Sequence, residues 1–479
     1  MNRPFDAKRY RRLLEGLEVT VLKLSEVEQE NEKMRLDSGY FAKLPVEIQK
    51  RIEDSRHAKL GSLCATFRKG IFDIKADSYV EEGIPFVRIA NLRDGLISDA
   101  GLAYITEKTH MAEKATALRY GDLVLSKTAY AAASFVNLRE CNASQDTIAV
   151  RLSEEGRRLC DGAYLAIYLN SKYGIALMRR QFQGNVQEHL SLDDGRKIPV
   201  PLFDAKLQAA VKAALAQADA ELHRAEVHLT RAETTLTAAL GLDGWQPPQA
   251  LSYTRRASQA FTAGRLDAEY FSPRVSELLM RLRASGRTVG EVAPARRERF
   301  VPSANGTFRY IEIGAVNSDG TANADTVEMT DAPSRATQVV RAGDVITSTV
   351  RPIRRLSALV LPEQDGAVAS SGFVVLKPQD VLAEALLTYL RLPLICELMD
   401  LHTSASLYPA ISENDLLNLP FPDITETDCE HISQNVRDAH AARHLARDLL
   451  AAAQRAVEIA IEQDEAAALA YLAEQGSPD

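Results

Sequence analysis

The most regular pattern of apolar positions lies between Asp204 and Leu240, a stretch that contains no Gly or Pro. Leucines recur in it every seven residues, and alanines recur with the same period between them. The two sets are Leu215, Leu222, Leu229 and Leu236, and Ala218, Ala225, Ala232 and Ala239. This spacing places both sets on one face of a helix, as at the a and d positions of a coiled coil. The pattern predicts a helix about 55 Å long that packs closely against a second helix.

A second long helix is predicted after Asp423 and extends to about Leu472. It has the same seam of small residues, which are Ala439, Ala446, Ala453 and Ala460, with Ala442, Leu449 and Ala456 between them. Asp204 at the first helix, and Asp423 or Thr425 at the second, are candidate N-caps. We expect the two helices to pair, most simply in antiparallel orientation.

Ahead of each long helix, short strand-like segments and turns occur in the same order, so the chain holds two copies of one pattern. The copies begin with MRLDSGYF at 34–41 and GRLDAEYF at 264–271. Each then has an apolar-Gly segment, a strand-like segment, a Gly-Asp turn before a strand, an Ala-Ser step into a strand, a Tyr-Leu helix and a proline pair. The landmarks lie at 60–63, 85–89, 120–126, 143–150, 168–169 and 198–201, and again at 289–292, 309–313, 342–348, 369–375, 389–390 and 419–422. Chance does not preserve such an order, so the chain contains an internal duplication.

The predicted fold class is mixed α/β (α+β), with two repeated globular domains joined by two long helices. The boundaries are an N-terminal extension with the start of the first repeat at 1–57, a first globular domain at 58–203, a long helix at 204–241, a linker with the start of the second repeat at 242–285, a second globular domain at 286–422 and a long C-terminal helix at 423–479. Within the extension, we expect a helix from Ala7 to Leu17 and a strand from Val19 to Leu24.

Composition is that of a globular protein, with 46% apolar and 25% charged residues among 479. No apolar run is long enough for a transmembrane helix, and the N-terminus lacks the pattern of a secretory signal, so we expect a cytoplasmic protein. The five cysteines are scattered, which indicates neither a zinc site nor a disulfide framework. The net charge of −8 is unusual for a nucleic-acid-binding protein that acts alone.

Motifs of common catalytic sites are missing from the sequence. It has no G-x-G-x-x-G after a strand, no phosphate-binding G-x-x-x-x-G-K-[ST], no Asn- or Asp-Pro-Pro-Tyr of amino-methyltransferases, no G-x-S-x-G and no H-E-x-x-H. Several histidines fall on the predicted long helices, where solvated or packing roles are the usual ones. We therefore assign no catalytic, cofactor-binding or metal-binding residues.

The segments that differ most between the copies follow matched strands, as expected of recognition loops on a common scaffold. After the Gly-Asp strand, the first copy reads KTAYAAAS at 127–134 and the second reads TVRPIRR at 349–355. Lys, Arg, Thr and Ser reach the phosphates and base edges of DNA, although an ordinary solvated loop explains any single residue equally well. The candidates are Lys127, Thr128, Tyr130 and Ser134, with Gln145 in the next turn, and Ser348, Thr349, Arg351, Arg354, Arg355 and Ser371.

A second pair of variable segments precedes the proline pairs. It reads RRQFQGNVQEH at 179–189 and HTSASLY at 402–408. Gln and Asn can bind adenine with two hydrogen bonds, while a polar turn before a helix is the alternative explanation. The candidates are Arg180, Gln183, Asn185, Gln187 and His189, and His402, Ser404, Ser406 and Tyr408, with Arg88, Asn91, Arg296, Arg297 and Arg299 as weaker ones.

At these residues the chain resembles the specificity (S) subunit of type I restriction-modification systems. The resemblance is carried by IPFVRIANLRDG, GDLVLSKTA, ASQDTIAVRL and QEHLSLDDGRKIPVP, by their counterparts in the second copy, and by the long helix after each copy. It covers residues 34–475, and residues 1–33 are an addition to it.

The resemblance implies that 58–203 and 286–422 are target-recognition domains, each reading one half of a bipartite double-stranded DNA target. It also implies that the long helices form a spacer that docks two methyltransferase (M) subunits. S-adenosylmethionine and adenine methylation would belong to those subunits. ATP and Mg²⁺ would belong to restriction (R) subunits, if present. This chain would then be a non-catalytic, cofactor-free part of a phage-defence complex.

Other functions remain open at this point. A coiled-coil scaffold or adaptor would use the same helices to present protein-binding domains. The specificity component of another DNA-modifying defence system would share the two-domain plan. An enzyme with an unrecognised nuclease or methyltransferase site is a third alternative, and the missing motifs argue against it.

Overall fold

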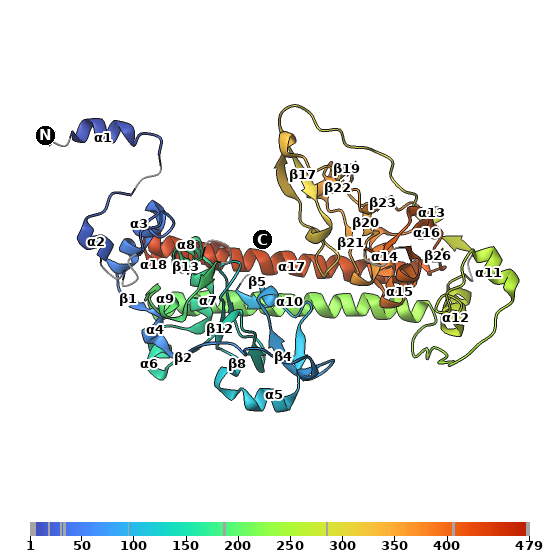
Figure 1. Ribbon diagram of the computed structural model, residues 1–479, viewed down its shortest axis with the longest axis horizontal. Helices are drawn as coiled ribbons and strands as arrows, with labels where there is room; N and C mark the ends of the chain where they lie inside the picture. The colour runs from blue at the N-terminus through green and yellow to red at the C-terminus, as the bar shows by residue number, and fades with distance from the viewer. Residues whose placement is uncertain are drawn as a thin grey trace. The chain divides into compact units, whose positions relative to one another are not determined.

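The computed structural model describes residues 6–17, 20–28, 31, 35–93, 95–184, 188–283, 286–404 and 408–475. The chain divides into two compact units, and Figure 1 labels many of their elements. Unit 1 comprises the chain up to Glu221 and from His444 onward, and unit 2 comprises Leu222–Arg443. Helices α10 (Ala205–Ala239) and α17 (Glu426–Glu462) each contribute one part to unit 1 and the other part to unit 2. The protein is therefore a mixed α and β protein with two globular domains, as the repeat predicts.

In unit 2, the two long helices pack against each other through the predicted seam. Ala225 of α10 packs with Ala439 and Ala442 of α17. Farther along α10, Leu236 shares a core with Ile432. Rising residue numbers on one helix thus accompany falling numbers on the other, which is antiparallel pairing. The small alanine side chains allow the helices to approach closely.

In unit 1, the same seam is buried at Leu215 and Ala218 of α10 and at Ala446 and Ala453 of α17. The N-terminal end of α10 is tied to the C-terminal part of the chain, because the Asp204 N–H donates a hydrogen bond to Glu465 Oε2 over 2.8 Å. Unit 1 is thus assembled from both ends of the chain.

The C-terminal helix is shorter than predicted. Helix α17 ends at Glu462, and a separate helix α18 runs from Glu465 to Gln475. Asp464 lies at the break, and its carboxylate accepts a hydrogen bond from the Ala467 N–H over 2.8 Å. Because aspartate is a strong N-cap, it starts a new helix here and does not continue the old one. At the other end, the Thr425 hydroxyl caps α17 by accepting the Asp428 N–H, as predicted.

The N-terminal extension also differs from the prediction. Helix α1 covers Ala7–Leu13 and stops before Gly16, whose positive φ of 82° is unsuited to an α-helix. Of the expected strand at 19–24, residue 19 lies outside the described residues, 20–23 have no regular structure, and Leu24 begins helix α2 (Leu24–Glu28). Val21 and Leu24 are exposed. Alternating apolar residues are not enough to form a β-strand, because its backbone N–H and C=O groups must also hydrogen-bond to a neighbouring strand.

Unit 1 is built around two sheets. One has the order β2-β12-β9-β10-β6-β5 and the other has the order β3-β7-β4-β11-β8. The strands of the first are β2 Cys64–Lys69, β12 Thr147–Leu152, β9 Leu123–Ser126, β10 Ala133–Phe135, β6 Leu96–Ile97 and β5 Leu92–Arg93. Those of the second are β3 Tyr79–Val80, β7 Ala103–Ile105, β4 Ile84–Val87, β11 Glu140–Ala143 and β8 Leu118–Arg119.

Short strand pairs and helices complete unit 1. The pairs are β1 (His57–Lys59) with β15 (Pro199–Pro201), and β13 (Phe182–Gln183) with β14 (His189–Leu190). The helices are α3 Lys43–Glu53, α4 Leu60–Leu63, α5 Glu107–Ala112, α6 Glu154–Leu159, α7 Gly162–Asn170, α8 Lys172–Gln181 and α9 Leu192–Arg196.

Unit 2 repeats this plan with smaller sheets, in the orders β18-β17-β22-β19 and β21-β20-β23. The strands are β17 Thr307–Ile311, β18 Asp325–Glu328, β19 Ala336–Val339, β22 Val368–Ser370, β20 Val345–Ser348, β21 Ser357–Leu359 and β23 Phe373–Leu376. Two short pairs are β16 (Arg287–Thr288) with β26 (Pro420–Phe421), and β24 (Thr403–Ser404) with β25 (Ala410–Ile411). The helices are α11 Ala257–Ala263, α12 Pro273–Leu282, α13 Val289–Val292, α14 Ala383–Arg391, α15 Pro393–Leu401 and α16 Glu413–Leu417.

The Arg-Leu-Asp motif that opens each copy has the same contacts in both units. Arg35 donates to the Asp37 carboxylate, with 2.8 Å from Nε to Oδ2, and its guanidinium carbon lies 4.4 Å from the ring centroid of Tyr40. The equivalent contacts join Arg265 to Asp267 and Tyr270. The hydrogen bond from arginine holds the pKa of each aspartate below its usual value. The repeat of sequence is thus also a repeat of contacts.

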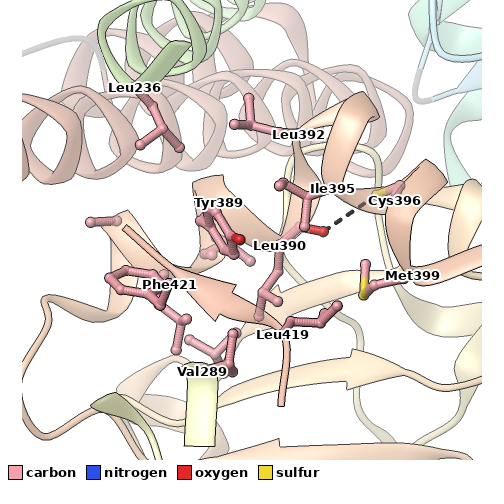
Figure 2. Packing of buried hydrophobic residues seen from close by; sticks show 14 of the residues in the cluster. Leu236, Val289, Tyr389, Leu390, Leu392, Ile395, Cys396, Met399, Leu419 and Phe421 are labelled. Carbon is pink, nitrogen blue, oxygen red and sulfur yellow. Dashed lines mark hydrogen bonds between the residues drawn. The ribbon is translucent and has the colours of Figure 1, made fainter. Parts of the chain in front are cut away.

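Matched tyrosines tie a helix to the proline pair in each unit. The Tyr168 hydroxyl in α7 donates to the carbonyl oxygen of Pro199 over 2.6 Å, and the Tyr389 hydroxyl in α14 donates to that of Pro420. Both side chains are fully buried. Figure 2 shows Tyr389 beside Phe421 in the core of unit 2, where the ring centroids are 5.0 Å apart. Each tyrosine fills the core with its ring and satisfies a proline carbonyl with its hydroxyl.

The Gly-Asp step before each matched strand has a structural role. The Asp122 carboxylate accepts the Arg119 N–H over 3.0 Å and forms an ion pair with Arg151 at 2.6 Å. The equivalent partners of Asp344 are the Arg341 N–H and the Arg296 guanidinium. Both aspartates are buried, so each needs its arginine to offset the loss of hydration. Arg296, a weaker candidate for DNA contact, is therefore a partner of this buried carboxylate.

Candidate nucleic-acid interface

The first variable loop of each unit begins at a matched serine. Ser126 ends β9, and its N–H donates to the Ala132 carbonyl over 2.9 Å. Ser348 ends β20, and its N–H donates to the Leu356 carbonyl over 2.8 Å. Each hydrogen bond closes the base of a loop on the end of a buried strand. We call these loops the strand loops, 127–131 in unit 1 and 349–355 in unit 2.

In unit 1, the strand loop lies beside the second variable segment. This segment, 182–191, joins α8 to α9, and we call it the helix loop. The helix loop of unit 2 is 402–412, between α15 and α16. Thr128 and His189 face each other in an antiparallel bridge. Next to them, the Leu190 N–H donates to the Lys127 carbonyl over 2.8 Å. Two segments that the sequence predicted separately are thus parts of one surface.

Unit 2 joins its two loops in the same way. Val350 of the strand loop and Ala410 at the helix loop form an antiparallel bridge. The Ile411 N–H donates to the Thr349 carbonyl over 3.0 Å. The loops differ in sequence between the units, but the backbone contacts that hold them are equivalent.

A third segment approaches each strand loop from a turn after the Ala-Ser step. The Lys127 N–H donates to the Asp146 carbonyl over 2.8 Å, and the Thr349 N–H donates to the Gly372 carbonyl over 2.9 Å. Exposed candidates lie in these turns, Gln145 in unit 1 and Ser371 in unit 2. Lys127, Thr128 and Thr349 are themselves half-buried at the base of their loops.

Tyr130 connects the strand loop of unit 1 to the segment that follows β4. Its hydroxyl donates to the Ile89 carbonyl over 2.6 Å. The neighbouring Arg88 is exposed, and one guanidinium nitrogen donates to the Gly101 carbonyl over 2.5 Å. Arg88 therefore joins Lys127, Gln145 and the exposed His189 in the same part of unit 1.

In unit 2, basic and aromatic side chains accompany the strand loop. The guanidinium carbon of Arg351 lies 5.9 Å from the ring centroid of Tyr408, whose side chain is 68% exposed. Arg354 is exposed in the same loop. Arginine and tyrosine together can bind phosphate, hydrogen-bond a base edge or stack on a base.

Sequence reasoning missed a basic and aromatic pair in unit 1. Lys69 Nζ lies 4.3 Å from the ring centroid of Phe72, which is 69% exposed. The Ile71 N–H between them donates to the Ala143 carbonyl, just before the turn that holds Gln145. No signal in the sequence marked this pair, because the exposure of Phe72 is visible only in the structure and both residues lie outside the segments that vary most between the copies.

Three candidates are buried, which corrects the sequence-based assignment. Asn91 is 1% exposed, and its side-chain amide donates to the Ser98 and Ala100 carbonyls. Ser134 lies inside strand β10, and Ser348 exchanges hydrogen bonds with the backbone of Val350. Strand pairing turns Ser134 and Ser348 into their units, and Asn91 is held inside unit 1 by its side-chain hydrogen bonds, so none of the three is exposed to a ligand.

Four further candidates are held by neighbours within their unit. Arg180 donates to the Tyr40 carbonyl over 2.7 Å, and Gln183 donates to Asp194 Oδ2 over 2.6 Å. The other two are Arg355, which contacts Glu233, and His402, whose ring centroid lies 5.5 Å from that of Tyr270. Burial lowers the pKa of His402, with a contribution from nearby Arg265, so its neutral form is favoured.

Of the remaining candidates, three lie outside the described residues and three have contacts within their own unit. Asn185, Gln187 and Ser406 lie outside the described residues. Ser404 belongs to β24, where its backbone pairs with Ala410. Arg297 forms an ion pair with Glu413 at 2.6 Å, and Arg299 pairs with Gln338 in a β-bridge.

In the part of the chain that the structure describes, no three or more His, Cys, Asp or Glu side chains are grouped so as to hold a metal ion. None of the helices described is both long and apolar enough to cross a membrane.

Comparison with known proteins found similarity to solved structures only. No family model and no curated protein matches the chain. The S subunit of a type I restriction-modification system from M. genitalium matches at 13% identity and a TM-score of 0.36, over 88% of this chain and 96% of that one. The HsdS subunit from Thermoanaerobacter tengcongensis matches at 18% identity and a TM-score of 0.27, over 88% and 96% of the two chains. A chain from a study of complex assembly in the type I R-M system matches at 17% identity and 0.26, over 88% and 97%. Two of these three structures are S (HsdS) subunits, and the similarity to them extends over 88% of this chain at low TM-scores.

Proposed function

We propose that the chain is the DNA sequence-specificity subunit of a type I restriction-modification complex. The observation that carries the proposal is the matched frame in the two units. In each, the strand loop and the helix loop are joined by the same backbone contacts, Thr128 opposite His189 and Val350 opposite Ala410. A frame that both units share, with different loops on it, is suited to reading two different DNA sequences with one fold.

The side chains on this frame suit DNA. Lys127 and Arg88 in unit 1, and Arg351 and Arg354 in unit 2, can contact phosphates or bind guanine. Gln145 and His189 supply further donors and acceptors. Each unit would read one half of a bipartite target. Such a two-part readout gives high specificity without a large surface in either unit.

The charge of the chain supports action within a complex. With a net charge of −8, the chain alone would bind the DNA backbone weakly, and the binding would fall steeply with salt. We propose that two methyltransferase subunits dock along α10 and α17 and supply basic surface around the DNA. They would also bind S-adenosylmethionine and methylate adenine. Restriction subunits, where present, would bring ATP and Mg²⁺, and this chain would catalyse no step.

Reconstitution of the full chain with its methyltransferase subunits tests the proposal. The complex should methylate adenines in one bipartite sequence, and sequencing that detects methylated bases should reveal two specific half-sites separated by a non-specific spacer. Methylation without sequence preference, or no DNA binding by the assembled complex, would exclude a specificity role and favour a scaffold. Turnover by the purified chain alone would favour an enzyme.

A further inference from the structure

Asn170 and Arg391 occupy matched positions at the C-terminal ends of α7 and α14. Each follows the Tyr-Leu pair that the two copies share. The flanking residues are kept, but this position changes from an amide to a guanidinium. Asn170 contacts the strand that follows the strand loop of unit 1, and Arg391 contacts the strand loop of unit 2 itself.

In unit 1, the Asn170 amide fits the first residue of β10. Its Oδ1 accepts the Ala133 N–H over 3.2 Å, and its Nδ2 donates to the Ala133 carbonyl. Nδ2 also donates to the Ala166 carbonyl in the preceding turn of α7, over 2.8 Å. One side chain thus fixes both backbone groups of the residue at which the loop re-enters the sheet.

In unit 2, Arg391 holds the end of the strand loop with a larger set of contacts. One guanidinium nitrogen donates to the Arg355 carbonyl over 2.8 Å and to the Ser357 carbonyl over 2.9 Å. In return, Arg355 Nε donates to the Arg391 carbonyl over 2.6 Å, and the Arg355 guanidinium contacts Glu233 of α10. Arg391 is only 8% exposed, so it is not itself placed to touch a ligand.

The backbone of both strand loops needs such support. Ala129 in unit 1 has a φ of 66°, and in unit 2 Arg351 and Arg355 have φ values of 50° and 60°. Residues other than glycine rarely adopt this left-handed conformation and keep it only where surrounding contacts enforce it. Arg391 contacts the backbone of Arg355 itself, and Asn170 contacts Ala133, where the loop that contains Ala129 returns to the sheet. A change at either position would therefore let the loop relax to another conformation.

We propose that Asn170 and Arg391 are positioning residues that determine the base preference of their own unit without touching DNA. This proposal rests on the proposed function, and it explains how two units with the same fold prefer different DNA bases. Because base recognition needs side chains placed to within a fraction of an ångström, a shift of the loop backbone changes the preferred base and does not simply weaken binding.

The test uses the full chain reconstituted with its methyltransferase subunits. Binding is measured for the preferred DNA and for a panel in which each recognised base pair is replaced in turn. Arg391→Gln should reduce the preference for the correct base by about tenfold at one half-site and leave the other half-site unchanged. Asn170→Ala should have the corresponding effect at the other half-site only.

Matched variants separate positioning from a general loss of structure. Arg287→Gln removes an ion pair with Asp380, a residue outside both loops of unit 2 and outside the long helices, and should leave both preferences unchanged. If Arg391→Gln does not fold, Glu233→Gln removes the support of Arg355 at a partly exposed site and should alter the same half-site.

Unchanged preferences in folded Arg391→Gln and Asn170→Ala complexes would overturn the inference, as would an equal loss at both half-sites. Absence of any sequence preference in the unaltered complex would instead refute the proposed function. The two failures are therefore distinguishable in one set of measurements.

Discussion

Thr128 and His189 face each other across an antiparallel bridge, although they belong to variable segments that are far apart in the sequence. Val350 and Ala410 have the same relationship in unit 2. Each candidate DNA-binding surface is therefore composed of two loops whose backbones are hydrogen-bonded to each other. Recognition residues in one loop should depend on the integrity of its neighbour.

Lys127 is the clearest candidate for a phosphate contact in unit 1. Replacing it by Gln should weaken DNA binding by the reconstituted complex to a similar extent on all sequences. The slope of log K against log salt concentration should decrease by about 1, because one fewer counterion is released. Lys108→Gln, an equal change of charge on the exposed face of α5, is the control. An unchanged salt slope would remove Lys127 from the interface.

Arg351 should contribute to base preference in unit 2. Its φ of 50° must be kept when the side chain is changed, so Arg351→Asn is the suitable variant, because Asn tolerates the left-handed region. We expect about 1 to 3 kcal/mol less discrimination at one base pair of one half-site, with no change in thermal unfolding. Competition binding with single-base variants of the target measures this. Loss of binding on all sequences alike would show a phosphate contact instead.

Ser134 should not contribute to DNA binding. It is fully buried in β10, and no partner for its hydroxyl was found among the described residues. Ser134→Ala removes an unsatisfied polar group and should raise the free energy of unfolding by about 1 kcal/mol while leaving DNA affinity unchanged.

Ser171 provides the matched control for this change. Its hydroxyl accepts the Gly174 N–H and donates to the Tyr168 carbonyl over 2.6 Å. Ser171→Ala should therefore lower the free energy of unfolding by about 1 to 2 kcal/mol. Chemical denaturation of both variants makes the comparison, and a destabilised Ser134→Ala protein would contradict the buried, unpaired hydroxyl.

Glu462 should make the stability of unit 1 depend on pH in the acidic range. Hydrogen bonds from Arg455 and Lys172 lower the pKa of Glu462 from 4.5 to about 2. A lowered carboxylate pKa means that its stabilisation is complete above the unfolded-state value and is lost as the pH falls towards 2. Glu462→Gln should cost about 1 to 2 kcal/mol at pH 7 and progressively less below pH 4.5.

Denaturant unfolding of the two proteins from pH 7 down to the onset of acid unfolding measures this difference. The Tyr173 hydroxyl also donates to Glu462, over 2.8 Å, and remains able to bond to a glutamine, so the variant mainly removes the charge. A difference in stability that stays constant across this range would contradict the lowered pKa.

The periodic features were predictable because they depend on local spacing. The heptads of Leu and Ala between Asp204 and Leu240 predicted α10, and the order of matched landmarks predicted two similar units. The break at Asp464 also has a local cause, because aspartate is a common N-cap. The sequence pattern nevertheless predicted one continuous helix, because alanines are frequent on both sides of Asp464.

The candidate site was only partly predictable. The contrast between two copies identified the variable segments, including Lys127 and Arg351, but it could not tell an exposed side chain from a buried one. Asn91 and Ser348 carry side chains of the kind that can hydrogen-bond to bases, and the structure buries both. Conversely, Asn170 and Arg391 lie at the ends of apolar helices, where no local pattern indicates contact with a distant loop.

The sequence by itself determined the duplication, the long helices and the two segments in each copy that differ, because these follow from residue order and period. Only the tertiary structure decided that Thr128 meets His189, that Ser134 points inward and that Arg391 supports the strand loop. The physical reason is that such contacts arise from backbone pairing between segments far apart in the chain. Their register depends on the packing of a whole unit and not on any one stretch of sequence.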